Sequence, residues 1–163
     1  IPAPWMSAPV VTVDDAALRD AAKELRLGYW VEQIDIQAAL LGALALCAEG
    51  KSAACIEGLK AAAMREDATE KHAVKPGQLV PARELLAEML LTQNKFAYAL
   101  REYEAVMAKE PNRYRTLAGA MAAARGAGDS AKARAMAVEV VKLGSDADSQ
   151  RATLQQAKQL AGG

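Results

Sequence analysis

The chain has 163 residues, 52% of them hydrophobic, which is enough for one hydrophobic core and short for two ordinary domains. Its 20 lysine and arginine residues balance its 20 aspartate and glutamate residues. Because no excess positive charge is available to hold phosphates or anionic lipid headgroups, the composition argues against nucleic acid as a partner.

Residues 1–13 predict an extended tail, since Pro2, Pro4 and Pro9 block helix formation and favour extended backbone. This end shows no charged leader followed by an apolar segment, so we expect no signal peptide within the sequence. The tail also carries Trp5, a large apolar side chain that suits docking onto another surface.

From residue 14 onward, apolar residues recur at steps of three and four, which predicts helices. Asp14 and Asp15 offer an N-cap and a favourable charge to the first helix. The expected helices are 14–27, 29–49, 52–65, 80–93, 96–109, 113–126 and 130–143, followed by a short cap helix over 147–161 with Leu154, Ala157 and Leu160 on one apolar face. No strand pattern with a period of two appears, so we expect an all-α fold.

The longest apolar run, AALLGALALCA, covers residues 38–48 and is well short of the roughly 20 residues that a membrane-spanning helix requires. We therefore expect a buried helix and no membrane insertion. The two cysteines, Cys47 and Cys55, are too few for a disulfide scaffold and are surrounded by alanine and leucine, so we expect buried free thiols.

Two segments of the chain repeat one another. The sequence PARELLAEMLLTQNKFAYALREYEAVMAKEPNR aligns with YRTLAGAMAAARGAGDSAKARAMAVEVVKL, and Asn94 then matches Gly128, 34 positions later. An earlier copy in the same register has its turn at Gly50, which is 44 positions before Asn94. Ten residues are therefore inserted between the first and second copies.

The period of 34, with a helix, a polar turn, a second helix and a Glu-Pro-Asn stop at residues 110–112, resembles the tetratricopeptide repeat family. The resemblance implies a right-handed α-solenoid of antiparallel helix pairs, closed by the cap helix, in a single domain over residues 14–163. It places the repeats at about 36–65, 80–113 and 114–144. The positions that the family reserves for small residues fall on Ala43, Cys55, Ala87, Ala99, Met121 and Ala133. Because Met121 is large, we expect looser packing around it.

A closer resemblance covers about residues 29–160. YWVEQIDIQ, EDATEKHAVKPG, PARELLAEMLL and EPNRYRTLAGA are similar, in this order, to segments in the C-terminal part of a group of uncharacterised bacterial tetratricopeptide-repeat proteins. This implies a larger parent protein with further repeats upstream and favours a periplasmic or envelope location. It implies no established reaction.

The insertion, EDATEKHAVKPG over residues 66–77, contains the single histidine of the chain, His72. Glu66, Asp67 and Glu70 add possible ligands, but no spacing typical of a metal site supports them. No nucleophile motif and no glycine-rich phosphate loop is present. We therefore expect an ordered connector with a Pro-Gly turn, and neither an enzyme nor a bound metal or cofactor.

Repeat arrays of this kind bind partners along a concave surface formed by the first helix of each pair. The resemblance assigns the groove positions to Gln37, Leu40, Leu44, Cys47, Glu84, Glu88, Leu91, Arg115, Ala118, Ala122 and Arg125. These would run from apolar through acidic to basic, which suits a peptide with an apolar anchor and ordered charges. We expect a non-catalytic scaffold that binds a protein or peptide. The alternatives are a self-assembly module, with Trp5 and Met6 of the tail docked into a groove, and a metal-binding or enzymatic protein that uses the insertion.

Overall fold

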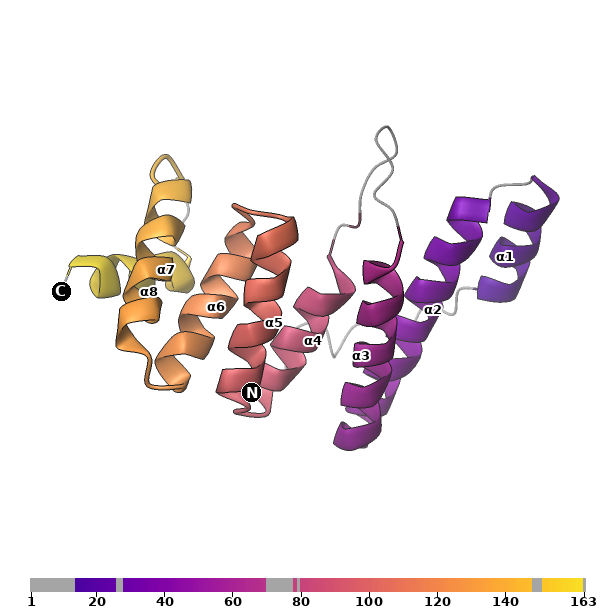
Figure 1. Ribbon diagram of the computed structural model, residues 1–163, viewed down its shortest axis with the longest axis horizontal. Helices are drawn as coiled ribbons and strands as arrows, with labels where there is room; N and C mark the ends of the chain where they lie inside the picture. The colour runs from indigo at the N-terminus through magenta and orange to yellow at the C-terminus, as the bar shows by residue number, and fades with distance from the viewer. Residues whose placement is uncertain (1–13, 26–27, 70–77, 79, 148–150, 163) are drawn as a thin grey trace. The chain divides into compact units, whose positions relative to one another are not determined.

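The computed structural model describes residues 14–25, 28–69, 78, 80–147 and 151–162, and within these ranges the chain is all-helical with no strand (Figure 1). The all-α prediction is therefore confirmed. The helices are α1 (Asp15–Glu24), α2 (Gly28–Ala48), α3 (Ser52–Asp67), α4 (Ala82–Thr92), α5 (Phe96–Lys109), α6 (Tyr114–Gly126), α7 (Ser130–Leu143) and α8 (Ala152–Gly162). They form two compact units: unit 1, Ile1–Ala73, holds α1 to α3, and unit 2, Val74–Gly163, holds α4 to α8.

The boundaries differ from the sequence expectation mainly at the insertion and the cap. Helix α3 continues through Glu66 to Asp67, so the first two residues of the insertion are helical rather than part of a connector. Helix α8 begins at Ala152 instead of residue 147. His72 and the Pro-Gly pair lie outside the described residues, as does the tail over 1–13, so the predictions made for them stay predictions.

Three turns between helices share one backbone structure. Gly50, Asn94 and Gly128 all take a positive φ, at 78°, 58° and 80°. In each turn the next residue donates its backbone N–H to the carbonyl five positions earlier, with a donor to acceptor distance of 2.9 Å in all three. This pattern closes a helix through a left-handed residue, which glycine and asparagine tolerate best. The register of the sequence repeat is thus reproduced in the backbone.

Small residues are buried on both sides of these turns. Cys55, Ala99 and Ala133 occupy the same place in the second helix of each pair and are at most 1% exposed. In the first pair the two helices approach closely, because a Cβ atom added at Gly58 would lie 2.9 Å from the Cβ of Ala43. Larger side chains at these places would force the paired helices apart.

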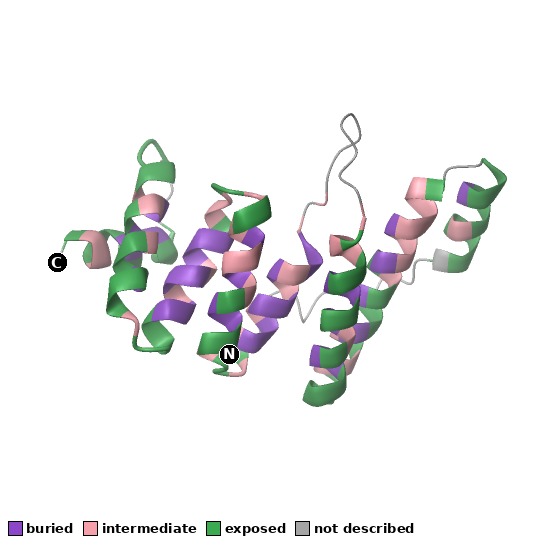
Figure 2. Cartoon of the chain, viewed as in Figure 1, coloured by how far each residue is buried: buried purple, intermediate pink, exposed green. Residues whose placement is uncertain are grey.

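Contacts between helices follow the chain order within each unit. In unit 1, α2 packs against both α1 and α3. In unit 2, each helix from α4 to α7 packs against its successor, while α6 also contacts α4 and α8. Buried residues accordingly form stripes along the helices, with exposed residues on the remaining surface (Figure 2).

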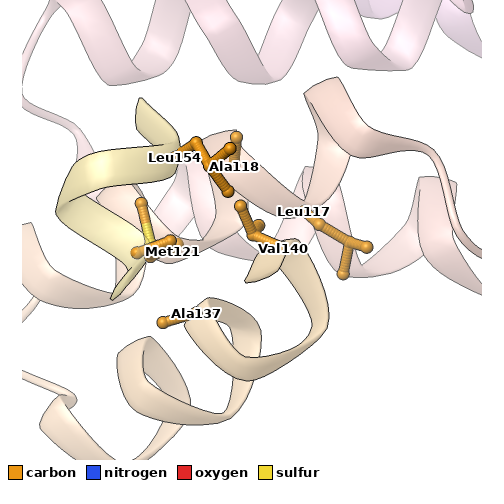
Figure 3. Packing of buried hydrophobic residues seen from close by; sticks show 7 residues of the cluster. Leu117, Ala118, Met121, Ala137, Val140 and Leu154 are labelled. Carbon is orange, nitrogen blue, oxygen red and sulfur yellow. The ribbon is translucent and has the colours of Figure 1, made fainter. Parts of the chain in front are cut away.

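Helix α8 covers the end of unit 2 with one apolar face, as predicted. Leu154 and Ala157 are 2% and 0% exposed and belong to a cluster with Met121 and Val140 (Figure 3). Gln155, Gln156, Lys158 and Gln159 of the same helix are exposed. Met121 itself is only 1% exposed, so the looser packing expected around this large residue does not open it to solvent.

Candidate interaction face

The most developed constellation of polar side chains in unit 2 links α4 and α6, two helices in contact. Glu84 and Glu88 are one turn apart on α4, and Arg115 lies in the first turn of α6. We call the surface that carries Glu84, Glu88, Leu91, Arg115, Ala118, Ala122 and Arg125 the α4–α6 face. The sequence assigned all seven to a groove.

Arg115 joins the two acidic residues instead of standing apart from them. Its Nη2 donates to a carboxylate oxygen of Glu88, and its Nε lies 3.5 Å from Oε1 of Glu84. The side chain of Arg115 remains 48% exposed and that of Glu88 30% exposed. One guanidinium is thus shared by two carboxylates, so the acidic and basic groups of the face are joined by ion pairs rather than separated into zones.

Glu84 is fully buried, at 0% exposure, although the sequence placed it on the groove surface. Thr116 donates its hydroxyl hydrogen to Oε2 of Glu84, and Nε of Arg113 donates to the same oxygen at 3.3 Å. Arg113 in turn donates to Glu110 at 3.0 Å. A buried carboxylate loses its hydration, and these donors compensate for that loss. Glu84 therefore orders the start of α6 beneath Arg115.

Tyr103 on α5 completes the cluster. It is 3% exposed, and a Cβ atom at Gly119 of α6 would lie 2.3 Å from Cζ of its ring. Burial, and then the negative charges of Glu88 and Glu84, raise the pKa of the Tyr103 hydroxyl well above its usual value. The hydroxyl is therefore protonated at neutral pH and serves packing and polarity rather than base chemistry.

The remaining positions on the α4–α6 face differ in accessibility. Leu91 and Ala122 are half-buried and Arg125 is exposed, so these three offer side-chain surface. Ala118 is 8% exposed and belongs to the core cluster under α8. The face thus presents a half-exposed arginine at one end of α6, an exposed arginine at the other, and apolar side chains between them.

Sequence reasoning missed Arg113, Thr116 and Tyr103 as partners of this cluster. Thr116 is a polar residue on the buried side of α6, and Arg113 follows the Glu-Pro-Asn stop, which by itself indicates only a helix boundary. No spacing rule pairs residue 84 with residue 113 or 116, since they meet only through helix packing.

Within the described residues, no group of three or more histidine, cysteine, aspartate or glutamate side chains is arranged to hold a metal ion. The cluster at Glu84 joins carboxylates, guanidinium groups and a hydroxyl through hydrogen bonds and ion pairs.

Two of the four groove positions assigned in unit 1, Leu40 and Cys47, belong to its core or its disulfide. Leu40 is 2% exposed and belongs to the core, while Leu44 is half-buried and Gln37 is exposed. Cys47 is bonded to Cys55 in a disulfide, with 5.1 Å between the Cα atoms. The prediction of free thiols is therefore wrong. Their alanine and leucine surroundings were a poor guide, because two cysteines on either side of a tight turn are brought together by the helix pairing itself.

An ionic cluster ties the three helices of unit 1 together. Arg65 of α3 donates from Nε and Nη2 to both carboxylate oxygens of Glu32, at 2.6 and 2.9 Å, and from Nη2 to Asp35 at 3.0 Å. Arg19 of α1 donates to the other oxygen of Asp35. The hydrogen bond from Arg19, with that from Arg65, holds the pKa of Asp35 below its usual value despite some desolvation.

Helix α2 has 21 residues and is long and apolar enough to cross a membrane by length and composition alone, a test that core helices of soluble proteins also pass. The apolar run over residues 38–48 is shorter than the helix that contains it, because the helix begins at Gly28 and its first half is also largely apolar. Only 22% of its most apolar stretch is buried, so the expectation of a buried helix holds for one face, and Leu41 is 61% exposed.

Comparison of the chain with known protein families, with curated proteins and with solved structures finds no match.

Proposed function

We propose that this chain is a tetratricopeptide-like repeat scaffold that binds a peptide segment of another protein on the α4–α6 face. The observation that carries the proposal is the threefold turn: Gly50, Asn94 and Gly128 share a left-handed conformation and the same closing hydrogen bond. Buried small residues follow each turn at the same distance. Arrays of such pairs function as binding surfaces, and the link from this fold to binding is an analogy between folds.

The chemistry of the α4–α6 face favours a particular kind of peptide. Arg115 is held by Glu84 and Glu88 yet keeps 48% of its side chain exposed, and Arg125 is exposed about three turns further along α6. Leu91 and Ala122 supply apolar surface between them. A segment with one apolar anchor flanked by acidic side chains would complement this arrangement. Pre-ordering of Arg115 reduces the entropy that binding would otherwise cost.

Helix α2 is, in this account, a helix of unit 1 and not a membrane span. Its charged residues, Glu32 and Asp35, are held by Arg65 of α3 and Arg19 of α1. A membrane span would have to separate these pairs or carry them into hydrocarbon, which is costly. Affinity for lipid vesicles would count against this assignment.

The proposal is tested by selecting peptides from a random display library on the full chain and measuring the affinities of the best binders. We expect acidic, apolar peptides whose Kd rises at least about tenfold in Arg125→Glu and in Leu91→Ala. The matched control is Lys142→Glu on α7, where the side chain is 75% exposed and lies off the face. Binders with equal affinity for all four proteins would contradict the proposed face.

Self-assembly is a second candidate, because unit 1 carries several exposed large apolar side chains. Leu18, Leu25, Leu41 and Met64 are between 50% and 69% exposed. Exposed apolar groups of this size are common at contacts between chains. Light scattering decides between the candidates: a concentration-independent monomer supports the scaffold alone, and a dimer that Leu41→Gln dissociates supports self-assembly.

A further inference from the structure

The disulfide of unit 1 has no counterpart in the equivalent turns of unit 2. In register, Cys47 corresponds to Leu91 and Cys55 to Ala99, and both unit 2 residues lie in the same kind of helix pair closed by the same turn. The turn therefore forms without a cross-link. The two cysteines in unit 1 require a reason of their own.

The core of unit 1 supplies that reason. Among the described residues of this unit, the large buried apolar side chains are Ile36, Leu40, Ile56 and Leu59, and the other buried apolar positions are alanines and Cys55. The described part of α1 contributes Ala22. A core this small stabilises a fold weakly, and small domains compensate with covalent cross-links. A disulfide between the end of α2 and the start of α3 reduces the conformational freedom of the unfolded chain. It thereby stabilises the folded α2–α3 pair, which holds most of this core.

We propose that Cys47 and Cys55 are an oxidation site, that the chain acquires this cross-link in an oxidising compartment, and that the closed bridge gives unit 1 its stable fold. Disulfides persist in such compartments and are rare where glutathione and thioredoxin keep thiols reduced. The inference rests on the covalent bond and the small core, and it stands apart from peptide binding by unit 2.

Burial sets the order of the chemical steps. Cys55 is 0% exposed and Cys47 is half-buried, so an external disulfide oxidant reaches the Cys47 sulfur first. The Cys47 thiolate attacks the oxidant's S–S bond, forms a mixed disulfide and releases one thiol. The Cys55 thiolate then attacks the Cys47 sulfur and releases the second thiol. Two electrons pass to the oxidant, and the two protons from the cysteines end on its thiols.

The same burial makes the closed bridge resistant to exchange. A reducing thiolate that attacks the Cys47 sulfur must expel Cys55 as a thiolate into an apolar, fully enclosed site, which disfavours the charged form. Attack on the Cys55 sulfur is blocked by its burial. We therefore expect a structural cross-link rather than a cycling redox pair.

The test uses the full chain carrying Trp5→Phe, so that Trp30, which lies on α2 of unit 1, is the tryptophan that reports. Cells are quenched in acid, and the unfolded protein is alkylated before and after reduction. We expect no alkylated cysteine before reduction and two after it. Thermal unfolding followed by tryptophan fluorescence should then shift down by at least about 5 °C when the chain has been reduced in denaturant and refolded with reductant present.

The matched variant is Cys47→Leu/Cys55→Ala, which installs the residue pair of the equivalent turn in unit 2. Its unfolding temperature should not respond to reductant. Two alkylated cysteines before reduction, or equal unfolding temperatures of the parent with and without reductant, would overturn the proposal. Peptide affinity on the α4–α6 face should be unchanged by reductant in every protein, so the outcome is independent of the proposed function.

Discussion

The ring of Tyr103 occupies the space that a side chain at residue 119 would need: a Cβ atom built on Gly119 would lie 2.3 Å from the ring carbon Cζ. The contact joins α5 to α6, and Tyr103 is only 3% exposed. The ring therefore has little room to move aside. Glycine at position 119 is required by this close approach, and not by backbone conformation.

Gly119→Ala should consequently destabilise unit 2. Overpacking costs about 1–3 kcal/mol, and the better helix propensity of alanine returns about 1 kcal/mol of it. Gly42→Ala in α2 is the control, since a Cβ atom there meets nothing within 4 Å and the change should stabilise the protein by about 0.5–1 kcal/mol. Urea unfolding followed by circular dichroism measures both. Stabilisation by Gly119→Ala would contradict this prediction, because it would mean that the ring of Tyr103 can move aside without cost.

Ala99→Leu should destabilise the α4–α5 pair by about 1–3 kcal/mol, because Ala99 is 0% exposed in the first turn of α5. Ala133→Leu should behave alike in α7, where Ala133 is 1% exposed. The control is Ala97→Leu, an exposed alanine two residues before Ala99. Lys132, an exposed neighbour of Ala133, is a less suitable control, because its Nζ donates to Glu104 at 2.6 Å and a substitution would also remove this bond. Equal melting temperatures for Ala97→Leu and Ala99→Leu would contradict the repeat register.

Glu84→Ala should cost about 1–3 kcal/mol, because it removes the carboxylate shared by Thr116 and Arg113 and leaves the buried hydroxyl of Thr116 without its acceptor. Glu139→Ala, whose partner Lys142 is 75% exposed at 3.8 Å, should cost no more than about 0.5 kcal/mol. Chemical denaturation of both variants checks the difference. Similar small losses would show that the cluster at Glu84 contributes little to folding.

The stability of unit 1 should depend on pH through Asp35. The hydrogen bonds from Arg19 and Arg65 lower its pKa in the folded chain. A lowered pKa contributes stability that is present above the unfolded value, about 3.9, and is lost as pH falls through the folded value. Asp35→Asn should therefore lower the unfolding temperature at pH 7 and flatten its decline below about pH 4.

The measurement is thermal unfolding by tryptophan fluorescence at pH 7, 5, 4 and 3. Asp20→Asn serves as the control, because Asp20 is 72% exposed and pairs with Lys23 at 3.4 Å on its own helix. Parallel pH profiles for the parent and Asp35→Asn would show that the bonds of Asp35 with Arg19 and Arg65 do not govern stability in acid.

The helices were predictable because each segment has its own helical spacing of apolar residues and its own turn residues at the ends. The turns at Gly50, Asn94 and Gly128 were marked by residues that tolerate a positive φ, and the buried Ala99 and Ala133 followed from the repeat register. Both signals are local, so a single sequence contains them. The cap face with Leu154 and Ala157 was readable for the same reason.

The site was less predictable because its partners are distant in sequence. The pairing of Glu84 with Arg113 and Thr116 depends on how α4 lies against α6, so Glu84 reads as a surface charge in the sequence and is buried in the fold. The bond between Cys47 and Cys55 was not predicted for another reason. Their spacing across a tight turn permits a disulfide, but the prediction of free thiols rested on the alanine and leucine residues around them.

The central claim, a peptide-binding face on α4 and α6, is tested most directly by mapping backbone amide shifts with nuclear magnetic resonance as a display-selected peptide is titrated into the isotope-labelled 17.2 kDa chain. We predict that the largest shift changes fall on Glu88, Leu91, Arg115, Ala122 and Arg125, with little change along the exposed sides of α5 and α7, and that they weaken with added salt. Shift changes confined to α5 and α7, or to unit 1, would contradict the claim.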